Sequence, residues 1–500
     1  MHMKTNKILW LVFFVGLLLR LIPVLLTRGL GIGLDDMFQY DMLARSLASG
    51  NGYRWYAYED LRMLEPYVHF DLSNTAYDPV RGVPTSFRAP LYPAFLTLIY
   101  LVVGVGAGRF FAVRLVQAGL GALLAPLTYA ASRRLFPDRE PVAVTSAWVV
   151  ACYPLLLIYP LGLATENLFF LLALASFLFL LMLAEASLQE RTILLSPHCG
   201  LRITPYGLRP AFLSALCLSL AALTRSVILP FAGLAVLWTW FALRQKRLAL
   251  LMALTMLVVL APWVIRNSLL HHKLTGIESS MGYNLYVGYH PQSNGSFTFG
   301  VSLDLIPILD DAERDRLGMQ QALAFIRAQP GRFLPLALNR LGFFFGLEKR
   351  VLMYFYSNNL VGYLPRPILL MAAAVLLLPF VVVAPSAALG LGLIRTNPRT
   401  TLLILLLLAY ILPHVFLLAE DRFHLALIPY LAMLAAQAWN GGFQAFRALW
   451  QGSMPRRASL ILALIGALLL FVNWGLELAR DADKIAALLG PDGNHTHFPY

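Results

Sequence analysis

The sequence predicts an all-α protein that crosses a lipid bilayer many times. Of its 500 residues, 59% are hydrophobic and only 13% are charged, and the mean hydropathy is +0.68. A soluble domain carries about 25% charged residues. Apolar runs of membrane-spanning length also recur along the chain. One protein core cannot cover so much apolar surface, so lipid must cover most of it, and a water-soluble globular protein is excluded.

About eleven segments are predicted to span the membrane within a single transmembrane domain over residues 1–500. The first, residues 8–27, follows Lys4 and Lys7 and is too long for the apolar core of a signal peptide. We therefore expect an uncleaved first helix with its N-terminus in the cytoplasm. The other predicted spans are residues 110–131, 142–162, 168–188, 211–223, 227–243, 248–265, 368–394, 401–419, 425–439 and 460–478.

The apolar stretch 89–108 decides the predicted topology. If it does not cross, five short loops rich in Lys and Arg fall together on the cytoplasmic side, as the positive-inside rule requires. Pro90 and Pro93 suit a re-entrant or interfacial piece packed on protein. We therefore predict that this stretch does not cross. Arg109 and Arg114 then lie near the outer side, which the charge rule does not explain.

The net charge and the cysteines add little to the functional prediction. The formal charge of +13 is assigned to the cytoplasmic loops, so no nucleic-acid partner is expected. Three cysteines are too few for a disulfide scaffold. Cys152 and Cys217 lie in apolar runs, where a small buried side chain is the simpler interpretation.

Two long external segments are predicted, residues 28–109 and 266–366. The first opens with DDMFQYDMLARSLASG, whose apolar residues recur at helical spacing before Gly50, as in an amphipathic helix on the outer membrane surface. The second contains an amphipathic helix within residues 310–333, acidic in its first turn and stopped by Pro-Gly. Loops of this length are usually functional or disordered, so chemistry is expected here.

Three acids at the outer boundary are candidates for chemistry. Asp35 and Asp36 follow the first span, and Glu166 is the sole acid in a stretch of more than forty residues. Carboxylates at this depth cost free energy unless they are solvated, paired or functional. The simpler alternatives are an N-cap role for Asp35 and charge complementation of a helix N-terminus for Glu166, where Thr165 could supply the cap.

Four arginines also gather on the predicted outer side. A lone boundary arginine is commonly an interface anchor, but four at one face suggest an anion, and guanidinium groups match phosphate oxygens with paired donors. Glu420 or Asp421 offers one of them, Arg422, an alternative partner. No phosphate-binding glycine loop, serine-hydrolase motif or metal-ligand cluster is present in the sequence. The four are Arg88, Arg225, Arg266 and Arg422.

In order along nearly the whole chain, these residues resemble the motifs of the integral-membrane glycosyltransferases of the GT-C superfamily. The similarity is to the branch of protein O-mannosyltransferases and lipid A aminoarabinose transferases. Two departures are Met37, where many relatives have Glu, and Ser226, where they often have Pro. The matching elements are Asp36 with Tyr40, Ala44, Gly50, Gly52 and Tyr53; RAPLYP with Arg88 and Tyr92; Glu166; Thr224–Arg225; PWVIRN with Arg266 and Asn267; Gly282, Asn284 and Gly288; and Arg422, Phe423 and Pro429.

The resemblance implies transfer of a sugar from a polyprenyl-phosphate donor to a glycan, lipid or protein acceptor, in the plasma membrane (the inner membrane of a prokaryote) and outside the cytoplasm. Asp36 would be the catalytic base and Arg266 and Arg422, with Arg88, would stabilise the leaving phosphate. Glu166 would orient the acceptor or the sugar, and an apolar groove for the prenyl chain would lie beside the second external segment. The other implied substrate-binding residues are Asp35, Tyr40, Tyr92, Arg225, Asn267 and Asn284.

Several alternatives stay open. Beyond the donor, no cofactor is certain; a divalent cation could bind if Asp35 takes the place of the missing second acid of the first motif. A lipid-diphosphate donor is a further alternative. A transporter or flippase for an anionic lipid or solute would also need outer arginines and a boundary acid, but transporters commonly carry polar residues near the midplane. The enzyme requires that Asp36, Glu166, Arg266 and Arg422 converge around one outer cavity.

Overall fold

Helices form almost all of the regular structure. The computed structural model describes residues 2–70, 72, 77–194, 207–349, 352 and 364–490. In these residues the only sheet is one antiparallel pair, β1 (Arg54–Trp55) and β2 (Val83–Pro84), which align Arg54 with Pro84. The predicted all-α fold class is therefore confirmed.

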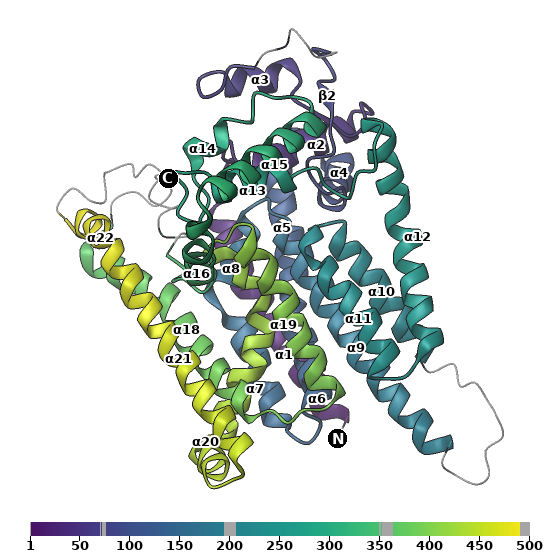
Figure 1. Ribbon diagram of the computed structural model, residues 1–500, viewed down its shortest axis with the longest axis vertical. Coiled ribbons are helices and arrows are strands. Elements are labelled where there is room, and N and C mark those ends of the chain that lie inside the picture. The colour runs from purple at the N-terminus through teal and green to yellow at the C-terminus, as the bar shows by residue number, and fades with distance from the viewer. Residues whose placement is uncertain are drawn as a thin grey trace.

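A bundle of apolar helices runs along the long axis of the molecule (Figure 1). Seven helical segments of the described chain have the length and composition to cross a membrane, or eight with the bent pair α7 and α8–η1, whose halves meet at 52°. Three further segments are α10 (Leu208–Ala222), η3 (Ser226–Ile228) with α11 (Leu229–Phe241), and α20 (Ile428–Trp450). The count of about eleven spans therefore stays a prediction. The seven are α1 (His2–Leu26), α5 (Arg109–Ala122) with α6 (Leu124–Leu135), α9 (Glu166–Leu194), α12 (Lys246–His271), α18 (Arg366–Leu393), α19 (Pro398–Phe416) and α21 (Met454–Arg480); the bent pair is α7 (Glu140–Cys152) with α8 (Pro154–Ile158) and η1 (Tyr159–Leu161).

The stretch 89–108 contains one short helix, α4 (Leu91–Val103), which ends at Gly104 with φ 80°. Thirteen residues of α-helix extend about 20 Å, less than the about 30 Å of a hydrocarbon core. Helix α4 packs against α2 (Asp36–Ala48) and α5. This length and packing suit the non-crossing role, which remains a prediction.

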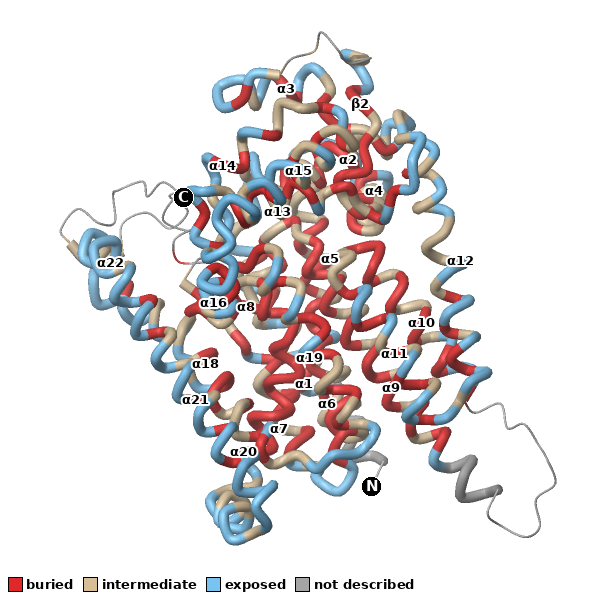
Figure 2. Tube along the Cα trace, in the orientation of Figure 1, coloured by how far each residue is buried: buried red, intermediate tan, exposed pale blue. Residues whose placement is uncertain are grey.

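The two long external segments form a lobe at one end of the bundle (Figure 1). Phe38 and Met42 of α2 are 4% and 2% exposed, and they share a core with Trp55 and Tyr283. The sequence suggested that this apolar face rests on the membrane surface, but protein covers it instead, because the second segment folds over the first (Figure 2). The lobe also contains α3 (Tyr58–Leu64), α13 (Met281–Tyr289), α14 (Phe299–Leu303), α15 (Asp311–Ala328), η4 (Pro330–Arg332) and α16 (Phe333–Phe344), and α22 (Ala482–Leu489) follows α21.

Basic connections gather at the opposite end of the bundle. Arg134, at the end of α6, lies 3.4 Å from Glu185 of α9. Arg399, at the start of α19, donates to the carbonyl of Arg134 at 3.0 Å. These contacts bring the end of α6, the region of α9 around Glu185 and the start of α19 together on one side, away from the lobe, and the charge rule assigns this side to the cytoplasm. The orientation itself remains a prediction.

The two outer arginines that the charge rule leaves unexplained have structural partners. Arg109 donates to Asp41 through Nε at 2.8 Å and Nη2 at 3.0 Å. Arg114 donates to the carbonyl oxygens of Leu161 at 2.8 Å and Gly31 at 2.7 Å. A guanidinium with several fixed donors suits such backbone capture. Arg109 therefore joins α5 to α2, and Arg114 joins α5 to the chain at Gly31 and Leu161.

Candidate functional site

The Asp36 carboxylate lies between two arginines that are far apart in sequence. Asp36 begins α2, and the N-cap residue Asp35 accepts the backbone N–H of Met37 at 2.9 Å. Arg88 Nη2 is paired with Asp36 Oδ1, and Arg422 Nη2 lies 3.4 Å from Asp36 Oδ2. The capping alternative for Asp35 is therefore observed, and Asp36 is the acid that joins the arginines.

Arg88 is held by α2 and by aromatic rings. It lies between β2 and α4, and its Nε donates to Gln39 Oε1 at 2.8 Å. Its guanidinium lies 5.3 Å from the ring centroid of Tyr40 and 5.1 Å from that of Phe87. Gln39 was not among the site residues predicted from the sequence. Its position three residues after Asp36 nevertheless puts both side chains on one face of α2.

Arg422 lies in the 3-10 helix η5 (Asp421–Leu427), between α19 and α20. Its Nε donates to Glu420 Oε2 at 2.7 Å, and the Glu420 side chain is only 2% exposed. From the sequence, Glu420 was an alternative partner for Arg422, in place of a bound anion. The structure shows both, because Nε faces Glu420 while Nη2 faces Asp36.

A second ion pair adjoins the first. Arg225 follows α10, and its Nη1 lies 2.5 Å from Oε1 of Glu166 at the start of α9. Thr165 donates its hydroxyl to Glu166 Oε2 at 3.1 Å. The guanidinium groups of Arg225 and Arg422 lie 5.3 and 5.5 Å from the same Phe423 ring, so the two pairs are contiguous. We call Asp36, Glu166, Glu420, Arg88, Arg225 and Arg422 the acid–arginine cluster.

The acid–arginine cluster is balanced in formal charge, with three carboxylates and three guanidinium groups. Burial alone raises the pKa of Asp36, but Arg88, Arg422 and Arg225 outweigh it, and the net pKa is lowered. Burial and the Asp36 carboxylate raise the pKa of Asp35. Desolvation opposes the charge of Arg422, but Glu420 and Asp36 leave its pKa well above the usual value. Asp36 is thus a firmly ionised, weakly basic group at rest.

Arg266 donates hydrogen bonds to backbone carbonyls of the lobe and to the side chain of Asn267. It donates to the carbonyl of Thr85 at 2.5 Å and to that of Tyr53 at 3.3 Å. Asn267 donates to the carbonyl oxygens of residues 276 and 277, at 2.9 and 3.1 Å. The Tyr53 hydroxyl donates to the carbonyl of Arg88 at 2.9 Å. Arg266 therefore supports the segment that carries Arg88, so the expected convergence is observed for Asp36, Glu166 and Arg422 but not for Arg266.

Tyr40 of α2 and Tyr92 of α4 pack together next to Arg88. The rings of Tyr40 and Tyr92 meet edge to face, with centroids 5.1 Å apart. The Tyr92 hydroxyl donates to Gln117 Oε1 at 2.7 Å. Tyr40 therefore carries the contact with Arg88, and Tyr92 fixes the position of Tyr40.

Asn284 is half-buried on α13, and the motif glycines beside it serve close packing. A Cβ at Gly282 would lie 1.9 Å from the carbonyl oxygen of Asp315 on α15. A Cβ at Gly288 would lie 2.2 Å from the carbonyl oxygen of Leu417. Only glycine allows these approaches. The motif therefore brings α13 against α15 and against the chain that leads to Arg422.

In the acid–arginine cluster, guanidinium groups compete with any divalent cation for the carboxylate oxygens. Among the described residues, no group of three His, Cys, Asp or Glu side chains could hold a metal ion. Asp36 has an arginine on each oxygen, and Glu420 is paired with Arg422. Hard cations require several free oxygen ligands. Guanidinium groups occupy these oxygens.

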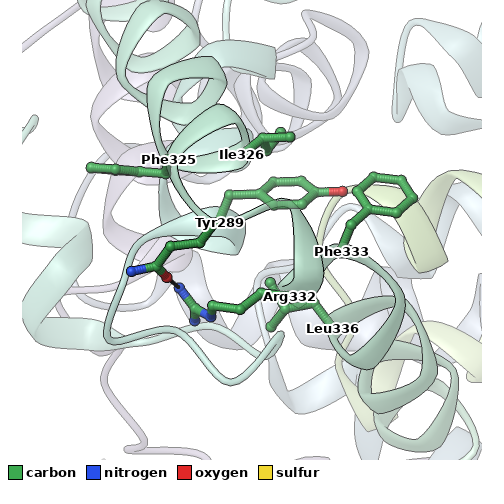
Figure 3. Close-up of a pocket in the computed structure, with 7 residues that line it drawn as sticks. Tyr289, Phe325, Ile326, Arg332, Phe333 and Leu336 are labelled. Carbon is green, nitrogen blue, oxygen red and sulfur yellow. Dashed lines mark hydrogen bonds between the residues drawn. The ribbon is translucent and has the colours of Figure 1, made fainter.

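A small, mostly apolar hollow lies elsewhere in the lobe, between α13, α15 and α16 (Figure 3). No member of the acid–arginine cluster lines it. Arg332 and Gln329 hydrogen-bond at 2.9 Å at its rim, and neighbouring Leu334 and Leu338 of α16 are 66% and 60% exposed. The lining residues are Tyr289, Phe325, Ile326, Gln329, Arg332, Phe333 and Leu336.

These features define a class: a polytopic α-helical membrane protein with a charged site at one end of its bundle. No protein-family model and no curated protein sequence matches the chain. Among solved structures, it is similar to two structures of the Archaeoglobus fulgidus oligosaccharyltransferase. One was crystallised with Zn and sulfate (14% identity, TM-score 0.49), and the other is AglB with an inhibitory peptide and a dolichol-phosphate (14% identity, TM-score 0.49). The similarity covers 98% and 99% of this chain but only 57% and 60% of those chains.

A third similar structure is ArnT from Cupriavidus metallidurans bound to undecaprenyl phosphate. It is 13% identical, with a TM-score of 0.37, and 92% of this chain and 84% of that chain are covered. AglB and ArnT are GT-C superfamily glycosyltransferases. Because these identities and TM-scores are low, the function of this chain has to be inferred from its own residues.

Proposed function

We propose that the protein is a glycosyltransferase that moves a sugar from a polyprenyl-phosphate donor to a nucleophilic acceptor. The observation that carries the proposal is the Asp36 carboxylate between Arg88 and Arg422, at the end of the bundle opposite the basic loops. A carboxylate supplies a base, and guanidinium groups supply paired donors for phosphate oxygens. The motif resemblance supports the same reaction.

In the proposed reaction, an acceptor O–H or N–H attacks the anomeric carbon of the donor. A new bond forms from the acceptor atom to that carbon while the bond to the phosphate oxygen breaks. The acceptor proton passes to Asp36, and both electrons of the broken bond leave with the polyprenyl phosphate. The leaving phosphate gains a negative charge, which Arg88 and Arg422 stabilise.

The resting contacts favour binding of the donor before the acceptor. Asp36 is a weak base while a guanidinium faces each of its oxygens, because these charges lower its pKa. The donor phosphate offers the same two arginines another anion. As their donors turn toward phosphate, Asp36 loses partners and becomes more basic. Donor binding thereby prepares the base for the acceptor.

The remaining residues are assigned by position. Glu166 and Arg225, beside Arg422, orient the sugar or the acceptor. Tyr40 holds Arg88 through its ring, and Arg266 supports the segment that precedes Arg88. The apolar α16 face and the hollow beside it lie in the second external segment, where a prenyl chain could bind. We place the protein in the plasma membrane, or the inner membrane of a prokaryote, with this site outside the cytoplasm.

The test uses the full chain in lipid nanodiscs with radiolabelled polyprenyl-phosphate sugars and a membrane extract as the acceptor source. The proposal expects label in a new product that mass spectrometry identifies, and only a small residual amount of that product in Arg422→Ala. Arg316→Gln, which alters an exposed ion pair on α15, is the matched control and should stay active. Movement of the intact donor across a vesicle bilayer without product would overturn the proposal in favour of a transporter or flippase.

A further inference from the structure

A second buried polar group includes His424, a near neighbour of Arg422 in the sequence, but has no part in the proposed chemistry. It consists of Tyr153, Glu348 and His424, which are 1%, 1% and 0% exposed. Tyr153 lies at the bend between α7 and α8, Glu348 follows α16, and His424 lies in η5. Three distant parts of the chain therefore meet at one buried point.

The hydrogen bonds determine how many protons this group holds. His424 Nδ1 lies 2.7 Å from the carbonyl oxygen of Phe344, and because a carbonyl only accepts, Nδ1 carries a hydrogen. His424 Nε2 lies 3.0 Å from Glu348 Oε1, so one further proton is shared between that nitrogen and that oxygen. The Tyr153 hydroxyl donates to the same oxygen at 2.6 Å. The pair is neutral overall whichever atom holds the shared proton.

The surroundings fix the imidazole in place. The ring of Phe380 on α18 stacks on His424, with centroids 4.0 Å apart and planes at 7°. Glu348 Oε2 is buried with no hydrogen-bond partner among the described residues. An unpaired buried oxygen costs free energy, and replacing such a group by apolar side chains is often neutral or stabilising. Stability alone is therefore a weak reason for this arrangement.

The position of His424 in η5 gives it a second role. A 3-10 helix has three residues per turn, so residues 422 and 424 project in different directions. Arg422 points to Asp36 and Glu420, while His424 points to Glu348 and Phe344. The η5 segment thus has one side chain in the acid–arginine cluster and another in the buried anchor.

We propose that Glu348 and His424 are positioning residues that fix η5 and thereby hold Arg422 at the distance that the donor phosphate requires. Tyr153 completes this anchor from the α7–α8 bend. The role of Arg422 rests on the proposed function, whereas the anchor itself rests on the contacts of η5. A displacement of about 1 Å at a reacting centre can lower the rate by about 100-fold.

A double-mutant cycle tests the anchor, because coupled residues give non-additive effects. Glu348→Ala should lower kcat/KM for a polyprenyl-phosphate sugar by about 10- to 100-fold. Glu348→Gln should recover most of that loss, because an amide nitrogen in the place of Oε1 has two hydrogens, which it can donate to a neutral His424 Nε2 and to the Tyr153 hydroxyl oxygen. In an Arg422→Ala background, Glu348→Ala should cause no further loss. An equal fold-loss in both backgrounds would overturn the proposal.

A substitute variant and a binding measurement are added to this test. If Glu348→Ala does not fold, Tyr153→Phe removes a single hydroxyl and should show a smaller loss with the same dependence on Arg422. Thermal stabilisation of each folded variant by undecaprenyl phosphate provides a readout without turnover: it should fall in Glu348→Ala and return in Glu348→Gln. An inactive wild type would count against the proposed function, whereas an active wild type with additive losses would count against the anchor alone.

Discussion

Replacing Asp36 with Asn tests the proposed base and the balance of charge in one variant. Asn keeps the size of the side chain but cannot take a proton from the acceptor. General-base catalysis contributes about two to four orders of magnitude in rate, which corresponds to about 2.7–5.4 kcal/mol at 1.36 kcal/mol per decade. We expect kcat to fall by that factor.

The same change should strengthen binding of the lipid phosphate. Arg88 and Arg422 lose their shared carboxylate, so they are free to pair with phosphate. The Asp36 side chain is 36% exposed, which screens its charge, and we expect a gain of about 1 kcal/mol, or about five-fold in Kd. Slower turnover with tighter undecaprenyl phosphate binding is a signature that simple misfolding would not produce.

The assay is single-turnover transfer with saturating donor, beside equilibrium binding of undecaprenyl phosphate in nanodiscs. Asp35→Asn is the matched control, because Asn caps a helix as well as Asp does, and its rate should stay within about three-fold. If Asp36→Asn turned over as fast as the wild type, Asp36 would not be the base. If the variant bound the lipid phosphate more weakly, the charge-balance reasoning would fail.

Three further predictions concern stability, pH and packing. Asp41→Ala should lower the thermal unfolding midpoint in detergent, because it leaves Arg109 without its buried partner, at a cost of about 3–5 kcal/mol. Arg88 and Arg422 lower the pKa of Asp36, so its ion pairs should persist as the pH falls from 8 to 5 and should weaken only well below about pH 4. The measurement is the pH dependence of kcat/KM. A loss of kcat/KM on the acid side near pH 6 that disappeared in Asp36→Asn would contradict this prediction. Gly282→Ala should cost about 1–3 kcal/mol, because its Cβ would meet the Asp315 carbonyl, and α13 would separate from α15; an unchanged unfolding midpoint would count against it.

Local sequence patterns predicted much of the fold. Apolar runs and helix-end signals predicted the long apolar helices and the limits of α2 and α15, because these depend on residues a few positions apart. The N-cap alternative for Asp35 was predicted for the same reason. The number of crossings was less accessible, since α10 and α11 are too short to settle it by length.

The site depends on pairings that local patterns do not encode. Asp36 meets Arg88 and Arg422 across 52 and 386 residues. The motif order indicated that these residues belong together but not which atoms pair. Arg266 illustrates the limit: a guanidinium that binds phosphate and one that binds backbone carbonyls have the same local sequence. No sequence pattern indicated the anchor formed by Tyr153, Glu348 and His424, because these residues come from three separate segments of the chain.

The equal numbers of carboxylates and guanidinium groups in the acid–arginine cluster have a consequence for which ligands reach it. Opposite charges a few ångströms apart nearly cancel beyond a Debye length of about 8 Å, so the cluster attracts ions in bulk water only weakly. Chloride and inorganic phosphate should therefore accumulate there only weakly. A phosphate carried on a hydrocarbon tail arrives by diffusion within the bilayer and needs no such attraction. Selection would then depend on the route of entry as well as on the anion.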